Sequence, residues 1–156
     1  MRWGGLASPG DTVAPKTITR QVSTTPERAY EGWLKAFDEF PKLYPQRFEH
    51  AAVLSHKGNE RVTTCTEIWH GRKMTYKMRQ TLHPGRAIDE VIFEGHGKGT
   101  KARWTFSPAP GGTQVQVAYE LKGVEAFFGR LFPKAFDKEL GEVADLWVKA
   151  LERGTV

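Results

Sequence analysis

Polar side chains on the inner phase of predicted strands are the residues of this sequence best suited to chemistry. Tyr76, Gln80 and Tyr119 each have apolar residues two positions before and two positions after them. A phenol or an amide buried in a solid core needs a hydrogen-bond partner, so polar tips on an inner face indicate a cavity that holds a ligand or water. The alternative is ordinary packing, with these tips hydrogen bonded to the backbone.

Glu90 is a further candidate, because a carboxylate removed from water can act as a general acid or base. It can face inward opposite Arg20 or Arg103, but its strand carries apolar residues on both phases. The favoured interpretation is therefore an ion pair on the surface. With the inward phase, Tyr76 and Glu90 would form the acid–base pair that a cyclase or dehydratase requires.

Other groups that could do chemistry have simpler explanations. Cys65 has no basic cluster near it in the sequence, which predicts a packed, unreactive thiol. The five histidines are isolated from one another and lack the spacing of metal ligands, so we expect them in surface loops. Lys98 lies among three glycines, but no helix or hydroxyl residue follows as in a phosphate-binding loop. We expect no metal and no cofactor.

The candidate residues lie on segments typical of antiparallel hairpins. Runs rich in β-branched and aromatic residues alternate with turn residues such as Gly58-Asn59 and Pro84-Gly85. The six predicted strands cover residues 48–56, 60–69, 72–82, 87–94, 100–107 and 113–121. Alternation assigns the inner face of the third, fifth and sixth of these strands. The inner phases of the other three remain open.

One more strand and one or two short helices precede these hairpins. A strand is predicted from Lys16 to Thr24, and Pro26 suits the first turn of the helix that follows. Pro41 interrupts a second short helix or turn. Residues 1–15 show no periodicity and contain several glycines and prolines, so we expect a flexible tail ahead of one domain over residues 16–154.

A long amphipathic helix ends the predicted domain. Its apolar residues recur every three or four positions from Phe128 to Leu151, with charged residues on the opposite face. Pro133 either kinks this helix or begins it, and Gly154 suits its C-terminal cap. Such a helix needs a broad apolar partner, which the sheet supplies. Trp147 is expected to pack on that sheet, far from the Phe128 end where a ligand would enter.

Composition bounds the function classes. A chain of 156 residues fits one domain that buries roughly 70% of its unfolded surface. No apolar run approaches the length of a membrane span, and the single cysteine excludes an internal disulfide, so a reducing cytoplasm is expected. The net charge of +5 is scattered among acidic residues, which predicts a solvated basic surface rather than a nucleic-acid site.

Three segments carry a resemblance to a known superfamily: TITRQVSTTPERAYEGWL, ARWTFSPAPGGTQVQVAYEL and FFGRLFPKAFDKELGEVADLWVKALE. In this order and spacing the chain resembles the polyketide cyclase/dehydrase and lipid-transport superfamily, the START-like or SRPBCC group. The resemblance implies an α+β helix-grip fold of the START and Bet v 1 kind. In that fold a curved antiparallel sheet of about seven strands wraps around the long C-terminal helix, and a cavity between them holds an apolar ligand.

The implied cavity and the inner phases together predict the ligand-binding residues Met74, Tyr76, Met78, Gln80, Glu90, Trp104, Phe106, Tyr119, Phe128 and Phe132. We expect the cavity to bind or transport a small hydrophobic or amphipathic ligand such as a lipid, isoprenoid, polyketide or aromatic molecule. No catalytic motif transfers residue by residue, so binding is favoured over catalysis. The alternatives are a polyketide cyclase/dehydratase-like enzyme and a protein-interaction module without a ligand. No nucleic-acid partner is expected, transient contact with a membrane surface stays open, and the sequence leaves the oligomeric state undetermined.

Overall fold

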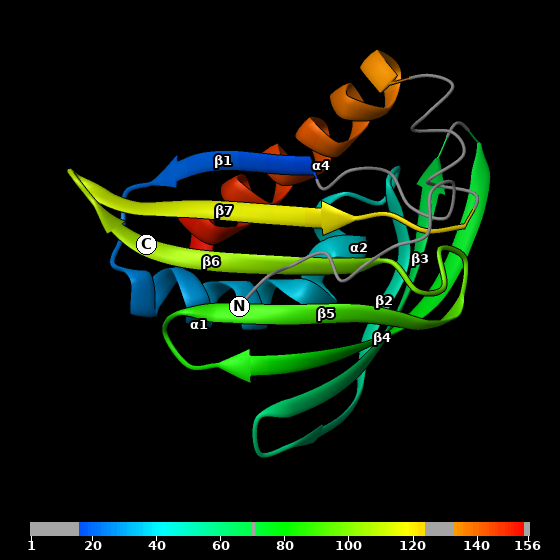
Figure 1. Ribbon diagram of the computed structural model, residues 1–156, viewed down its shortest axis with the longest axis horizontal. Coiled ribbons are helices and arrows are strands. Elements are labelled where there is room, and N and C mark those ends of the chain that lie inside the picture. The colour runs from blue at the N-terminus through cyan, green and yellow to red at the C-terminus, as the bar shows by residue number, and fades with distance from the viewer. Residues whose placement is uncertain (1–15, 70, 124–132, 155–156) are drawn as a thin grey trace.

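A seven-stranded antiparallel sheet forms most of the structure, a computed structural model that describes residues 16–69, 71–123 and 133–154 (Figure 1). The strands are β1 (Lys16–Val22), β2 (Phe48–Lys57), β3 (Glu60–Trp69), β4 (Arg72–His83), β5 (Ala87–Gly95), β6 (Lys101–Ala109) and β7 (Gly112–Glu120). Their spatial order is β1-β7-β6-β5-β4-β3-β2, so β1 and β2 form the two edges. From β3 onward each strand pairs with the strand before it, and β7 also pairs with β1.

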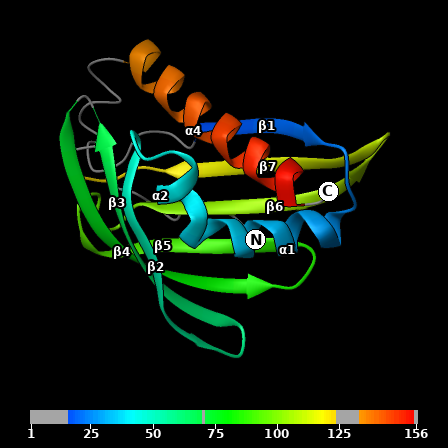
Figure 2. The ribbon, with the colours of Figure 1, turned by 180° about the vertical axis from the view of Figure 1, so that it is seen from behind.

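The described helices lie on one face of this sheet (Figure 2). They are α1 (Pro26–Ala36), the 3-10 helix η1 (Phe37–Glu39), α2 (Phe40–Leu43) and the long α4 (Pro133–Gly154). Seen from behind, α1, α2 and α4 lie in front of the sheet (Figure 2), and β2 to β4 curve away from the direction of the other strands. The sheet therefore wraps around the helices, and the predicted helix-grip fold is confirmed.

Local sequence explains where α1 begins. Thr25 is extended and its hydroxyl accepts a hydrogen bond from the Arg28 backbone amide at 3.3 Å, which satisfies one of the free donors of the first turn. Pro26 follows at the first helical position, where no backbone donor is needed. The buried side of the helix includes Tyr30 and Trp33, which face the sheet and α4.

The apolar stripe of α4 is buried as its periodicity predicted. Leu140, Val143, Trp147 and Leu151 are all at most 8% exposed. The described part of the helix begins at Pro133. Residues 124–132 lie outside the described residues, so the choice between a kink and a helix start at Pro133 stays open. Phe128 and the predicted N-terminal tail lie outside the described residues, so the domain boundary at residue 15 stays a prediction.

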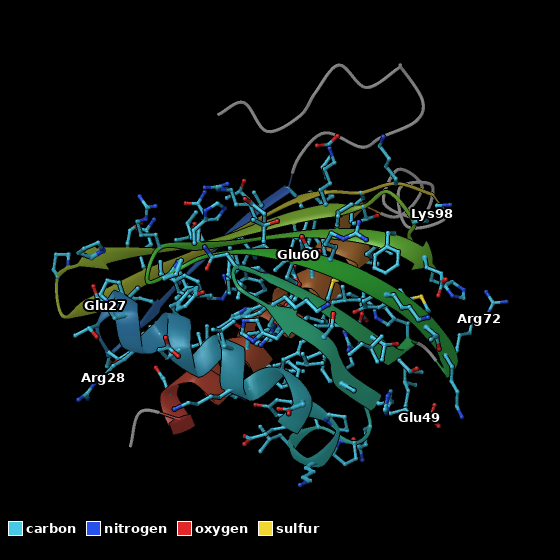
Figure 3. The ribbon with its side chains drawn as sticks, turned by 90° about the horizontal axis from the view of Figure 1, so that it is seen from below. Glu27, Arg28, Glu49, Glu60, Arg72 and Lys98 are labelled. Atoms are coloured by element: carbon cyan, nitrogen blue, oxygen red, sulfur yellow. The ribbon has the colours of Figure 1, made fainter. Side chains whose placement is uncertain are left out.

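The structure assigns the inner phases that the sequence left open. In β2 the buried residues are Phe48 and Ala51, and the register of this strand shifts twice against β3. In β3 the inward residues are Arg61, Thr63 and Cys65, and in β5 they include Ile88 and Glu90, all of which are buried. In Figure 3, Glu27 and Arg28 at the start of α1 and Arg72 at the start of β4 point away from the interior.

A bulge bends the sheet beside the cavity described below. The register of β4 against β5 shifts between Lys77 and Met78. Gly95 lies opposite with a φ of 90°, and a Cβ atom there would collide with the Thr75 carbonyl oxygen. Glycine is therefore required for β5 to approach β4 at this point, and bulges of this kind increase the local bend and twist of a strand pair.

Candidate ligand-binding cavity

A cavity of about 140 Å³ lies between the inner face of the sheet and α4. Its described lining residues are Phe37, Phe40, Phe48, Ala51, Cys65, Glu67, Trp69, Met74, Tyr76, Met78, Glu90, Ile92, His96, Thr100, Lys101, Ala102, Trp104, Tyr119, Leu121, Leu140, Val143 and Trp147. His96 and Lys101 are also exposed, so the cavity reaches the surface beside the β5–β6 connection. The lining thus combines an apolar wall with a few polar groups, as small-molecule sites do.

Aromatic rings form the inner end of the cavity. The Trp147 indole lies 4.2 Å from the Phe40 ring and 5.4 Å from the Trp104 ring, measured between centroids. Phe48 packs on Phe40 at 4.9 Å. Trp147 therefore lines the cavity together with Phe40 of α2. The Phe128 end of the helix, from which the sequence placed Trp147 far away, lies outside the described residues.

Most of the predicted ligand-binding residues border the cavity: Met74, Tyr76, Met78, Glu90, Trp104 and Tyr119. Gln80 is fully buried behind Glu90, to which it is hydrogen bonded. Phe106 packs edge-to-face on Tyr30, away from the cavity lining. Phe128 and Phe132 lie outside the described residues. Ligand binding by any of these residues stays a prediction.

Glu90 faces the interior, so the favoured surface ion pair is wrong. The residue is only 8% exposed; Oε1 accepts a hydrogen bond from Trp104 Nε1 and Oε2 accepts one from Gln80 Nε2, each at 2.8 Å. The arginines considered as its partners, Arg20 and Arg103, bind aspartates elsewhere. The sequence did not distinguish the inner phase of β5, because the outer phase of this strand also carries apolar residues.

The apolar surface on the outer face of β5 is partly shielded by an arginine side chain. The guanidinium of Arg79 lies over the Phe93 ring, 4.9 Å from its centroid. A long arginine side chain can shield apolar surface while its charged end stays in water. Phe93 therefore needs no burial in the core, and Glu90 takes the inner phase.

Arg61 completes the buried network and was missed in the sequence. Only 4% of it is exposed, although arginine is rarely buried without partners. Its Nε donates to Gln80 Oε1 at 2.8 Å and its Nη1 donates to the Leu34 carbonyl at 3.2 Å. The guanidinium also lies 6.0 Å from the Trp33 ring centroid. The only feature of the sequence that could have indicated a buried Arg61 is its position opposite Gln80 in the β3–β4 hairpin.

This network joins two opposite charges through a neutral amide. Burial raises the pKa of Glu90, and the hydrogen bonds from Gln80 and Trp104 and the charge of Arg61 reduce that rise without cancelling it. Burial likewise lowers the pKa of Arg61, while the Glu90 charge acts in the opposite direction. Gln80 presents its oxygen to the guanidinium and its nitrogen to the carboxylate, so its amide orientation is fixed by both neighbours.

A second acid was also missed, and it changes the partner of Tyr76. The Tyr76 hydroxyl donates to Glu67 Oε2 at 2.6 Å, so Tyr76 is paired with Glu67 and not with Glu90, the partner considered for the enzyme alternative. Burial, followed by the neighbouring Cys65 and Glu67, raises the pKa of Tyr76 well above its ordinary value. Burial also raises the pKa of the Cys65 thiol, which agrees with an unreactive cysteine.

Tyr119 differs from Tyr76 in having a free hydroxyl. It lines the cavity, yet no hydrogen bond joins its phenol to any residue in the described part of the chain. Burial raises its pKa above the ordinary value, and the charges of Glu90 and Glu67 add to this effect. The cavity therefore contains a protonated phenol able to donate to a ligand.

The described residues contain no candidate metal site. Among residues 16–69, 71–123 and 133–154 there is no cluster of three or more His, Cys, Asp or Glu side chains that could hold an ion. None of the described helices is both long enough and apolar enough to cross a membrane.

Comparison with known proteins identifies the fold. No protein-family model and no curated protein matches the sequence. Among solved structures, TTHA0849 from Thermus thermophilus has a TM-score of 0.74 at 22% identity, covering 90% of this chain and 96% of that one. The Zhui aromatase/cyclase from Streptomyces sp. R1128 has a TM-score of 0.63 at 17% identity, covering 90% of each chain. A START superfamily protein from Mycobacterium smegmatis has a TM-score of 0.62 at 20% identity, covering 92% of this chain and 95% of that one.

These likenesses and the sheet topology define a START-like, SRPBCC-type helix-grip fold. The same fold occurs in an aromatase/cyclase and in a START superfamily protein, so the fold by itself does not select a reaction or a ligand. The function has to be argued from the cavity.

Proposed function

We propose that this protein binds a small, largely apolar ligand with one polar group in the cavity between the sheet and α4. The observation that carries the proposal is the cavity itself, with an aromatic wall at one end and beside it the Tyr119 phenol, which has no hydrogen-bond partner among the described residues. A ligand that accepts a hydrogen bond from this phenol would be held and oriented in a largely apolar site, whereas a solid core would have favoured a protein-interaction module.

The volume limits the size of the ligand. A cavity of roughly 150 Å³ is known to accommodate a benzene molecule, while sites for drug-sized ligands are about 300 to 1,000 Å³. At about 140 Å³ this cavity suits a single ring rather than a sterol or a long acyl chain. Among the classes considered from the sequence, a small aromatic ligand fits best. The buried free thiol of Cys65 supports a reducing compartment such as the cytoplasm as the proposed location.

The direct test is to identify a bound ligand. Native mass spectrometry of the protein purified from its own source should show a mass increment of one small molecule per chain. A fluorescent aromatic probe should bind with a stoichiometry near one and be displaced by that molecule. A protein that carries no ligand and binds no aromatic probe would contradict the proposal.

A second candidate function is acid–base catalysis on such a ligand. The observation in its favour is that Glu90 borders the cavity and has a raised pKa, which brings a carboxyl group towards the range useful for proton transfer near neutrality. The aromatase/cyclase with the same fold makes this worth testing. The test is deuterium exchange at the carbon beside the carbonyl of a ring ketone, followed by NMR. Exchange that Glu90→Gln abolishes would support an enzyme.

A further inference from the structure

One row of side chains crosses the inner face of the sheet at right angles to the strands. The register pairs Arg61 with Gln80, Gln80 with Glu90, Glu90 with Ala102, and Ala102 with Tyr119. Arg61, Gln80, Glu90 and Ala102 are buried, and the last three strands of the row each contribute a residue to the cavity lining. These five residues are called the polar row below.

The row beside it has a different character. Leu82, Ile88, Trp104 and Val117 are paired in the same way across β4 to β7, and all four are buried. Hydrogen-bonding groups on this part of the inner face are therefore concentrated in the polar row. The exception is the indole N–H of Trp104, which donates to Glu90.

Ala102 interrupts the polar row between Glu90 and Tyr119. Its register partners are Glu90 on one neighbouring strand and Tyr119 on the other, and Ala102 borders the cavity. Adjacent strands are about 4.8 Å apart, so the backbones of Glu90 and Tyr119 are separated by roughly 10 Å. Longer side chains on both sides of a methyl group leave a notch above it, open towards the cavity.

Both sides of this notch have unused hydrogen-bonding capacity. A carboxylate has about four acceptor positions, and Glu90 uses one on each oxygen for Trp104 and Gln80. The Tyr119 hydroxyl uses none towards the described residues. The notch thus offers an acceptor from one side and a donor from the other.

We propose that the notch above Ala102 is a subsite for the hydroxyl group of a phenol or a small ring alcohol, whose ring fills the aromatic end of the cavity. This inference rests on the proposed function and names its ligand class. A hydroxyl is the smallest group that can donate to Glu90 and accept from Tyr119 at once. A carbonyl would serve Tyr119 alone. An ammonium would serve Glu90 alone, and it would meet the buried positive charge of Arg61 in the same row.

The test compares two ring compounds of nearly equal shape, p-cresol and p-xylene, by calorimetry and by NMR titration. A purely apolar cavity prefers p-xylene, because a methyl group leaves water more readily than a hydroxyl does. A hydrogen-bonding subsite reverses that order. Two hydrogen bonds of ordinary net strength correspond to about a tenfold preference for p-cresol.

Variants locate the preference in the notch. Tyr119→Phe should lower p-cresol affinity several-fold and leave p-xylene affinity unchanged. The matched control is Tyr76→Phe, which removes another phenol from the same cavity, one already bonded to Glu67. It should preserve the preference for p-cresol. Ala102→Val fills the notch and should also remove the preference, with p-xylene binding reporting that the variant is folded.

The outcomes separate the subsite from the proposed function. If p-xylene binds as tightly as p-cresol, or if Tyr119→Phe keeps the tenfold preference, the hydroxyl subsite is wrong and cavity binding stands. If neither compound binds, cavity binding of single rings is wrong and the subsite falls with it. A preference lost in Tyr119→Phe and in Ala102→Val but kept in Tyr76→Phe supports the subsite.

Discussion

The indole rings of Trp33 and Trp147 are stacked, with centroids 4.5 Å apart and planes inclined by only 7°. Trp33 comes from α1 and Trp147 from α4, so this contact joins the two longest of the described helices directly. Trp147 also borders the cavity. The same side chain therefore holds the helices together and shapes the ligand wall.

Replacing Trp147 should reduce stability and enlarge the cavity. Truncating a buried tryptophan to alanine typically costs about 3 to 5 kcal/mol, and we expect Trp147→Ala to lower the free energy of unfolding by that amount in urea denaturation. Lys149→Ala, at an exposed position of the same helix, is the control and should change it by less than about 0.5 kcal/mol. Equal midpoints for the two variants would show that the stacked pair contributes little.

Glu90 should make the stability of the protein decrease with rising pH. Because burial raises the pKa of Glu90 in the folded state, the folded protein keeps a proton that the unfolded chain has already released. In that window the unfolded chain binds fewer protons, so the free energy of unfolding falls as pH rises from the ordinary carboxyl pKa through the raised one, then levels off. Subtracting the pH profile of Glu90→Gln should isolate this decrease. A difference profile that rises with pH would contradict a raised pKa.

Removing the buried guanidinium of Arg61 should lower the free energy of unfolding, because its hydrogen-bond and charge partners would remain buried without it. Arg61→Met leaves the Gln80 oxygen without its donor and Glu90 without its nearest buried positive charge. Breaking a buried charge pair on one side costs about 3 to 5 kcal/mol. We expect Arg61→Met to lower the free energy of unfolding by that amount in the native protein and by less in the Glu90→Gln variant. A double-mutant cycle measures this difference. Arg79→Met, on the exposed outer face, is the control, and additive effects in the cycle would mean that the two charges are uncoupled.

Filling the cavity from β4 should block ligand binding without unfolding the protein. Met78 borders the cavity and is 9% exposed, so Met78→Trp would place an indole in the space that the ligand needs. We expect probe binding to disappear while thermal unfolding stays cooperative. Lys77→Trp puts the same ring on the opposite face of the same strand and should leave binding intact. Unchanged binding in Met78→Trp would place the site elsewhere.

The sequence was sufficient for the helices and strands because their signals are local, and the resemblance of three segments to the START-like group implied how these elements are arranged. The spacing of Trp147 and Leu151 on one helical face, and turn residues such as Gly58 and Gly85, determine the elements and their order. The structure places the strands close to their predicted bounds and confirms the helix-grip arrangement.

The polar interior was harder to predict because it depends on pairing between strands. Glu90 lies on a strand with apolar residues on both faces, and only the cover that Arg79 gives to Phe93 explains why. Arg61 and Glu67 are charged residues of β3 that point inward. This becomes recognisable only from the strand register, which places Arg61 opposite Gln80 and Glu67 near Tyr76. Local composition does not contain that register.

The polar row also links ligand binding to the order of folding. Arg61 and Tyr119 belong to the same row but to strands at opposite ends of the hairpin series, so the row exists only after every strand pair from β3 to β7 has formed in register. A transition state that lacks any one of these pairs has no complete polar row, and one that lacks the β5–β6 or the β6–β7 pair has no subsite above Ala102. A ligand held by the row would then slow unfolding and leave the folding rate unchanged, so its stabilisation would be kinetic protection of the native state alone.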